Sequence, residues 1–336
     1  MTRVAPRFWY GRRVQARLLW PLSRMFGLVV ALRRRYLNQP GRATRLPVPV
    51  LVVGNIAVGG SGKTPVVAWL VEQLSAAGYR PGVVSRGYGG RTSGARLLAE
   101  TDDPGEVGDE PLLLARRTGV AVAVGVDRPC AARLLVDEAA CDVVVSDDGL
   151  QHYPLARDVE IAVVDAHTLG NRWLLPAGPL REPLARLSDV DVVVAHGDLD
   201  PALARACAGV PVFDMQLVGD TLHSIDGEPS RTRPLVELSG MTVHAVAGIG
   251  RPERFFAQLR AAGLNVVPHP FPDHHPFVPE DLAFGDRAPC VMTSKDAVKC
   301  RGFAPPDCWE LPVSANIPAG AFERILEKLR HGRQAA

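Results

Sequence analysis

The stretch VLVVGNIAVGGSGKTPVVAWL, residues 51–71, constrains the fold more than any other part of the sequence. It runs from a β-branched segment through a glycine-rich turn into a segment with helical spacing, which predicts strand, turn and helix in succession. A turn of small residues before Gly-Lys-Ser/Thr presents backbone N–H groups at a helix N-terminus and so forms an anion site. A glycine-rich turn with an incidental lysine is the alternative. With strand and helix both in place, we predict a phosphate-binding loop.

The positions of this loop have separate roles in binding a nucleotide. Its glycines leave room for the backbone to close on phosphate, Lys63 reaches the outer phosphates and the Thr64 hydroxyl joins Mg²⁺. The loop departs from the usual pattern at its first position, where Ala57 stands in place of glycine. The predicted phosphate-binding residues are Ala57, Val58, Gly59, Gly60, Ser61, Gly62, Lys63 and Thr64.

Strand and helix patterns alternate from residue 47 onward. Strands are predicted within 48–53, 80–90, 120–125, 141–149, 159–166 and 191–197, and helices at 64–74, 109–119 and 127–139. The strands are continuous valine-rich runs, which indicates parallel strands covered on both faces. We therefore predict an α/β fold in which residues 46–208 form a doubly wound parallel sheet of the P-loop type.

A second α/β series follows the first. Its predicted strands are 242–249, 264–271, 289–295 and 308–314, and its predicted helices are 251–263 and 318–332. Residues 209–240 are predicted to form a short hairpin linker. We expect a second, smaller α/β domain at 241–336, and a cleft between two such domains is a favoured place for a ligand.

The N-terminal segment carries a charge imbalance. Residues 1–45 contain eleven arginines and no acidic residue or lysine, which leaves 27 basic against 36 acidic side chains in the remainder. Such a basic end indicates an anionic partner. The longest uncharged apolar stretch, residues 25–32, is too short to span a bilayer, and no signal-peptide cleavage site follows it.

We predict that this segment is an amphipathic helix, interrupted near Pro21, that lies on an anionic membrane surface. A surface helix packed on its own domain and an organellar transit peptide are alternatives. Nucleic acid is not expected as a partner because no binding motif supports it. The six cysteines show no CxxC spacing, which indicates reduced thiols of a cytoplasmic protein rather than a disulfide frame or zinc site.

Two acidic pairs stand where parallel strands or loops end. Asp147 and Asp148 follow a valine run, and a phosphate loop needs a metal-side carboxylate on a neighbouring strand. The alternative is an ordinary Asp-Gly turn. Asp109 and Glu110 begin a predicted helix, where acids also simply favour the positive end of the helix dipole.

Two further clusters carry chemistry. The segment PFPDHHPF, residues 270–277, places Asp273, His274 and His275 in a loop, where they could act as a general base, a metal site or a surface turn. The segment LPAGPLREP, residues 175–183, places Arg181 and Glu182 in a second loop. That pair could contact phosphate or metal, or form a surface ion pair.

Seven motifs in this order make up a resemblance that covers nearly the whole chain. They are VGNIAVGGSGKTP, SRGYGG, GDEPLLLA, SDDGLQH, LLPAGPLREP, FPDHHPF and TSKDAVKC. Together they resemble the tetraacyldisaccharide 4'-kinase family of the lipid A pathway. The resemblance implies transfer of the ATP γ-phosphoryl group, with Mg²⁺, to the 4'-hydroxyl of an acylated disaccharide lipid, giving lipid IVA. It also implies a monotopic enzyme on the cytoplasmic face of the bacterial inner membrane, without an obligate protein partner.

The resemblance assigns roles residue by residue. Asp109 matches a catalytic base that works with a histidine, and we choose His274 for the latter because it directly follows Asp273. Gln151 matches a nearby motif position, and Ser294 departs from a position that is more often acidic. The remaining assignments are Lys63 as a catalytic residue, Arg181 as a nucleotide contact, and Thr64, Asp147, Asp148 and Glu182 at the metal.

Two other functions share part of this pattern. A membrane-associated P-loop NTPase acting as a switch or targeting factor would have the same loop and basic helix, but it does not explain a second domain that carries DHHPF. A nucleotide-binding scaffold without catalysis would fit if the acidic pair lay away from the loop. The predicted catalytic set joins the two domains, so we expect closure about the linker to complete it.

Overall fold

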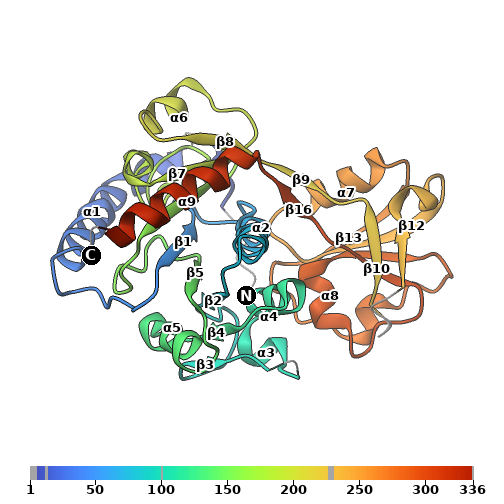
Figure 1. The fold of residues 1–336 in the computed structure, drawn as a ribbon. Helices are drawn as coiled ribbons and strands as arrows, with labels where there is room; N and C mark the ends of the chain where they lie inside the picture. The colour runs from blue at the N-terminus through green and yellow to red at the C-terminus, as the bar shows by residue number, and fades with distance from the viewer. Residues whose placement is uncertain (1–5, 12–13, 100, 226–230, 335–336) are drawn as a thin grey trace.

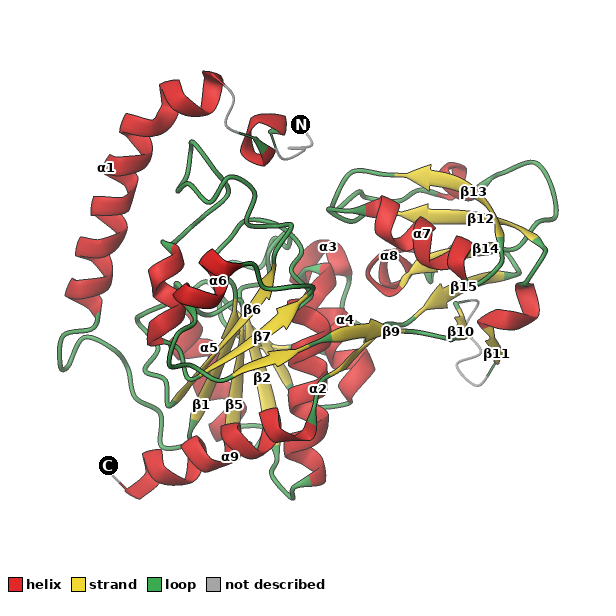
Figure 2. Cartoon of the chain, turned by 90° about the horizontal axis from the view of Figure 1, so that it is seen from above, coloured by secondary structure: helices red, strands yellow, loops and turns green. Residues whose placement is uncertain are grey.

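The computed structural model describes residues 6–11, 14–99, 101–225 and 231–334, and it contains two α/β domains side by side (Figures 1 and 2). The larger one is built on an eight-stranded sheet with the order β3-β4-β2-β5-β1-β6-β7-β8. All neighbouring strands pair in parallel except β3, which pairs antiparallel with β4. The strands are β1 (Val50–Gly54), β2 (Pro81–Ser85), β3 (Arg96–Leu97), β4 (Val122–Val124), β5 (Val143–Asp147), β6 (Val159–Asp165), β7 (Val192–His196) and β8 (Val212–Asp214).

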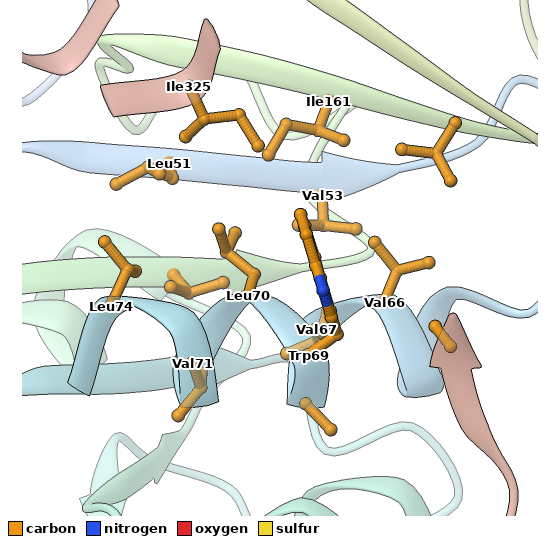
Figure 3. Packing of buried hydrophobic residues seen from close by; sticks show 14 of the residues in the cluster. Leu51, Val53, Val66, Val67, Trp69, Leu70, Val71, Leu74, Ile161 and Ile325 are labelled. Carbon is orange, nitrogen blue, oxygen red and sulfur yellow. The ribbon is translucent and has the colours of Figure 1, made fainter. Parts of the chain in front are cut away.

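Helices cover both faces of this sheet, because successive side chains of each strand point to opposite faces and both sets are apolar. On one face, Leu51 and Val53 pack against α2 (Lys63–Ala76), α4 (Asp109–Thr118) and α9 (Ala319–Gln334) (Figure 3). On the other, Val50 and Val52 pack with α5 (Arg128–Asp137) and α6 (Pro201–Ala206). The predicted doubly wound α/β fold is confirmed. The short helices η1 (Arg7–Tyr10), α3 (Pro104–Val107) and η2 (Leu184–Asp189) complete this domain.

The helix α9 lies on the first domain, although the sequence boundary assigns residues 241–336 to the second. Ala321, Ile325 and Leu329 are buried in the same cluster as Leu51 and Ile161 of the central strands. These side chains recur every four residues and so form one apolar stripe. The chain thus returns to the first domain to cover its sheet, and Figure 1 shows α9 across that domain.

We expect Ile325→Ala to lower the free energy of unfolding by about 2–5 kcal/mol, because it empties part of a fully buried site. Ile325 has no exposed surface. Urea denaturation followed by far-UV circular dichroism measures the change. Glu323→Ala, an exposed position on the same helix, is the control and should change stability by less than about 0.5 kcal/mol. Equal losses in the two variants would contradict the docking of α9.

The second domain has a six-stranded sheet with the order β11-β10-β15-β14-β12-β13. Strands β12 to β15 pair in parallel, while β10 pairs antiparallel with β11 and β15. The strands are β10 (Thr221–Ser224), β11 (Thr232–Pro234), β12 (Thr242–Ala247), β13 (Asn265–Pro270), β14 (Cys290–Thr293) and β15 (Cys308–Leu311). The helices are η3 (Leu235–Leu238), α7 (Pro252–Ala261), η4 (Pro279–Leu282) and α8 (Ser294–Cys300). All six cysteines are free thiols, and all but Cys130 are buried.

A two-stranded ribbon joins the domains. It consists of β9 (Gln216–Val218) and β16 (Ser314–Asn316), which pair antiparallel (Figure 1). The chain leaves the first domain along β9 and comes back along β16. The predicted linker at 209–240 is therefore divided: β8 belongs to the first sheet, the β10–β11 hairpin belongs to the second, and only β9 lies between them.

Residues 14–37 of the N-terminal segment form a single helix, α1 (Val14–Leu37), that continues through Pro21. The predicted interruption is wrong. Proline removes one intrahelical hydrogen bond, that of the Arg17 carbonyl, and Arg17 is exposed, so water can take that acceptor. The helix is attached to the first domain by small residues: Ala16 and Ser23 are buried, and Ser23 Oγ donates to the Leu174 carbonyl at 2.7 Å. No helix in the described part of the chain is long and apolar enough to cross a membrane.

Candidate active site

The predicted phosphate loop lies between the end of β1 at Gly54 and the start of α2 at Lys63. Asn55 Nδ2 donates to Ser61 Oγ at 3.0 Å, and both residues are buried, so this bond ties the two ends of the loop together. Gly62 precedes the helix with a φ of 83°, a left-handed conformation that favours glycine. The contacts that shape the loop therefore do not involve the Lys63 side chain, which remains available to contact an anion.

The geometry of the loop fits a polyphosphate. The first N–H groups of α2 have no intrahelical acceptor, and Gly62 offers no side chain to cap them. A Cβ placed on Gly59 or Gly60 would meet no atom within 4 Å, so the space in front of the loop is open. Open space, free N–H donors and a lysine at a helix start together form an anion site.

The acidic pair lies beside this loop. Val53 of β1 is in register with Asp147, the last residue of β5, so Asp147 stands next to the point where the loop begins. The Lys63 ammonium lies 3.5 Å from Asp148 Oδ1, and Arg181 Nη1 donates to Asp148 Oδ2 at 3.0 Å. The structure thus brings Lys63, Arg181 and both aspartates together.

Burial and neighbouring charges shift the pKa values of the two aspartates in opposite directions. Burial raises the pKa of Asp147 to about 7, and the negative charges of Glu110 and Asp148 add to this effect. Burial acts in the same direction on Asp148, but Lys63 and Arg181 outweigh it and hold the pKa of Asp148 well below its usual range. Asp148 Oδ1 accepts no hydrogen bond from the described residues. Two adjacent carboxylates with an oxygen to spare fit Mg²⁺, which prefers oxygen ligands.

Glu182 is placed differently from its predicted role at the metal. It is 1% exposed, its Oε2 accepts from Gln151 Nε2 at 2.9 Å, and its Oε1 accepts from the Tyr153 hydroxyl. Gln151 also donates to the Asn55 carbonyl at 2.9 Å. Since both carboxylate oxygens are engaged, this geometry favours a role in holding the segment after Asp148 against the phosphate loop.

The predicted pair of Asp109 and His274 joins the two domains. Asp109 is the first residue of α4 and is 5% exposed, and its Oδ2 lies 3.0 Å from Nδ1 of His274, in the loop after β13. The neighbouring His275 instead contacts Asp281 at 2.8 Å within the second domain. Of the two adjacent histidines, His274 is therefore the one that reaches the first domain.

Two further observations bring the second domain close to the acidic pair and the phosphate loop. Lys295 Nζ donates to Glu110 Oε1 at 3.0 Å, and Glu110 is among the charges that raise the pKa of Asp147. A Cβ placed on Gly250 would lie 3.8 Å from Asp273 Oδ2 and 3.9 Å from the Gly60 nitrogen. Gly250 of the second domain thus lies near Gly60 of the loop.

Sequence reasoning does not single out two cations at this site. Arg128 is 4% exposed, and its Nη1 donates to the Asp148 carbonyl at 3.0 Å. Lys295 contacts Glu110 as described above. Arg128 lies at the start of a predicted helix of ordinary pattern. Lys295 falls in the predicted strand 289–295, whereas the structure ends that strand at Thr293 and starts α8 at Ser294, so the motif TSKDAVKC is the only signal for Lys295.

Comparison with known proteins gives one consistent result. A family model described as tetraacyldisaccharide-1-P 4'-kinase matches residues 15–330. The tetraacyldisaccharide 4'-kinase of Aromatoleum aromaticum is 62% identical over 338 residues, which cover 100% of both chains. The protein of the same name from Azoarcus sp. strain BH72 is 60% identical over 339 residues, covering 99% of this chain and 97% of its own.

A solved structure is similar over most of the chain. LpxK from Aquifex aeolicus, crystallised in complex with ATP, superposes with a TM-score of 0.78 and is 28% identical. The match covers 94% of this chain and 100% of that one.

Proposed function

The chain belongs to the tetraacyldisaccharide-1-P 4'-kinase family, and on that premise we propose how its residues transfer phosphate from ATP to the 4'-hydroxyl of tetraacyldisaccharide 1-phosphate. This reaction makes the chain an ATP-dependent lipid kinase of lipid A biosynthesis. One observation carries the assignment of residues: the phosphate loop with its acidic pair lies in one domain, and the Asp109–His274 contact joins that domain to the other.

The phosphate loop, residues 57–64, is proposed to bind the ATP phosphates, with Lys63 and Arg181 as the cations on their oxygens. Thr64, Asp147 and Asp148 would hold Mg²⁺, which when bound neutralises charge on the transferred phosphoryl group. Glu182 is proposed to position Gln151 rather than to bind the metal. Positioning and charge neutralisation are the main contributions that a phosphoryl-transfer site makes.

Asp109 is proposed as the general base. Its carboxylate takes the proton of the 4'-hydroxyl while that oxygen bonds to the γ-phosphorus, and the bond from the γ-phosphorus to the ADP oxygen breaks. ADP leaves, and the proton passes from Asp109 to solvent. His274 orients the carboxylate from the second domain, so the base is in place only when the two domains are together.

Incubation of the protein with γ-labelled ATP, Mg²⁺ and tetraacyldisaccharide 1-phosphate in detergent micelles tests this function. Label in the lipid at the 4' position is the expected result. Label in free phosphate without lipid product would instead indicate an NTPase switch, and absence of turnover would indicate a nucleotide-binding scaffold. Either of these results contradicts the proposal.

We propose that α1 holds the enzyme on an anionic membrane surface, on the cytoplasmic face of the bacterial inner membrane. Apolar side chains on one face of α1 recur every three or four residues and are 50–74% exposed: Val14, Leu18, Leu22, Met25, Val29, Leu32 and Tyr36. The opposite face is the one that packs on the first domain. An exposed apolar stripe on an arginine-rich helix suits the boundary between headgroups and acyl chains of an anionic bilayer, the surface at which a lipid substrate presents its headgroup.

Replacing Leu18, Met25 and Val29 together with glutamate should lower the affinity for phosphatidylglycerol-containing vesicles at least about tenfold. Each of these side chains loses apolar burial worth about 1.5–3 kcal/mol, and tenfold is about 1.4 kcal/mol. Vesicle co-sedimentation measures the affinity. Val236→Glu, at an exposed apolar position of the second domain, is the matched control. Unchanged vesicle binding by the triple variant would exclude α1 as the membrane contact.

A further inference from the structure

Lys295, the second residue of α8, is surrounded by the groups of the proposed base. Its ammonium lies 3.0 Å from Glu110 Oε1, 3.0 Å from Asp273 Oδ1 and 3.3 Å from Nε2 of His274. The side chain is 16% exposed. Lys295 therefore contacts Nε2 of the imidazole ring, while Asp109 contacts Nδ1.

The hydrogen-bonding capacities of these groups fix the form of His274. A lysine ammonium has three donors and no acceptor, so Nε2 of His274 must accept and carries no proton. An ionised carboxylate only accepts, so Nδ1 carries the proton and donates it to Asp109. The ring is thus neutral and is held in its Nδ1–H tautomer.

The charges around the ring act on it in both directions, and Lys295 is the one that opposes protonation. Burial lowers the pKa of Lys295, but Glu110, Asp109 and Asp273 outweigh it and raise that pKa, so the ammonium stays charged. The bond to Asp109 raises the pKa of His274, and the charge of Asp273 acts in the same direction; burial and Lys295 lower it, but the net direction is upward. Three further groups face the pair: Lys299, whose Nζ lies 3.9 Å from Asp109 Oδ2; Asp273, whose Oδ1 lies 3.8 Å from Nε2 of His274; and Tyr88, whose ring centroid lies 5.3 Å from that of the imidazole.

We propose that Lys295 is a positioning residue that keeps His274 neutral in the Nδ1–H form, so that Asp109 stays an ionised base in a fixed orientation. This proposal rests on the function proposed above. A protonated His274 would direct an Nε2–H at the ammonium and would hold Asp109 in a full ion pair, in which the carboxylate is a weaker proton acceptor. The proton of the 4'-hydroxyl still passes to Asp109, and neither Lys295 nor His274 gains or loses a proton in the step.

The pH dependence of kcat tests the proposal. Without the Lys295 cation the pKa of His274 rises, and the active neutral ring forms only at higher pH. In Lys295→Met, the acidic limb of the profile should therefore move to higher pH. The expected loss of kcat is about tenfold on that limb and less than about threefold at the alkaline end, because a tenfold change corresponds to one unit of the controlling pKa.

Two control variants separate this role from a structural one. Lys295→Arg keeps a cation and should leave the acidic limb where the wild-type enzyme has it. Lys328→Met removes a lysine that pairs with Asp191 at 3.1 Å, at the opposite end of the sheet from the phosphate loop, and should leave the profile unchanged. An equal loss of kcat at every pH in Lys295→Met, or no loss at all, would overturn the proposal.

Nitrogen NMR of the full chain labelled with ¹⁵N-histidine gives a readout that does not depend on turnover. The His274 signals, assigned by their loss in His274→Gln, should show a protonated Nδ1 and a bare Nε2 at neutral pH in the wild-type protein. In Lys295→Met, Nε2 should become protonated. A protonated Nε2 in the wild type would refute the role of Lys295, whereas failure of the wild type to label lipid would refute the kinase assignment alone.

Discussion

Lys63→Ala is expected to lower kcat/KM for ATP about 10³-fold. The ammonium is the cation that the phosphate loop itself supplies, and it already lies 3.5 Å from Asp148. Its removal takes positive charge from the transferred phosphoryl group and from the acidic pair at once. The loop keeps its shape in this variant, because the Asn55–Ser61 bond and Gly62 determine that shape.

Steady-state transfer of label from ATP to lipid measures this loss, and thermal unfolding checks that the variant folds. Lys328→Ala is the matched control, since it removes a lysine that pairs with Asp191 away from the phosphate loop. A value of kcat/KM for Lys63→Ala within about tenfold of the wild type would mean that another cation binds the outer phosphates.

Asp109→Asn should lower kcat by about 10²–10⁴-fold, the range of general base catalysis, while the KM for ATP stays nearly constant. Asparagine keeps the size of aspartate, and its amide oxygen can still accept from Nδ1 of His274. The variant thus preserves the contact between the domains and removes only the proton acceptor. A loss confined to kcat is the signature of an interaction made in the transition state.

The chain contains a second Asp–His pair that serves as the control. Asp281 and His275 lie 2.8 Å apart within the second domain. Asp281→Asn changes the same chemistry in the same loop region and should leave kcat within about twofold, as expected of a site outside the reaction. The loss in Asp109→Asn should also be non-additive with His274→Ala, because the two residues act as a unit. Near wild-type kcat in both Asp109→Asn and His274→Ala would exclude the pair as the base.

The sequence is most informative where local physics decides the structure. The valine runs at 48–53 and 141–149 form β1 and β5 because β-branched side chains suit a strand covered on both faces. The glycines at 59 and 62 adopt left-handed φ values in the loop that their spacing predicts. Local pattern was sufficient for these elements and for the order of strand and helix.

Local sequence patterns do not indicate which elements pack together when those elements are far apart in the chain. The apolar stripe of α9 predicts a helix with one buried face, but nothing in its spacing says which of two sheets it covers. The pairing of β9 with β16 is equally hidden from local reasoning, because both strands are short and almost the whole second domain separates them in the sequence. Local composition alone predicts a linker at 209–240, and it carries no information about which strands these residues pair with.

The candidate site likewise contains some residues that local motifs predict and others that only long-range contacts reveal. The motif DDG locates the acidic pair because a strand end and a turn are local features, and the structure places it beside the loop. Lys295 and Glu110 meet across 185 positions of sequence, so neither residue indicates the other. Glu182 looks like any loop carboxylate in the sequence, and only its two hydrogen-bond partners distinguish it.

The docking of α9 on the first sheet has a consequence for how the protein is made. A ribosome releases residues 50–214, which supply all eight strands of that sheet, long before it releases 319–334. During that interval α9 does not yet pack on Leu51 and Ile161, so the nascent chain exposes hydrophobic surface that favours aggregation. We expect nascent chains stalled before residue 319 to recruit chaperones and to be cleaved readily by proteases, and full-length release to end both.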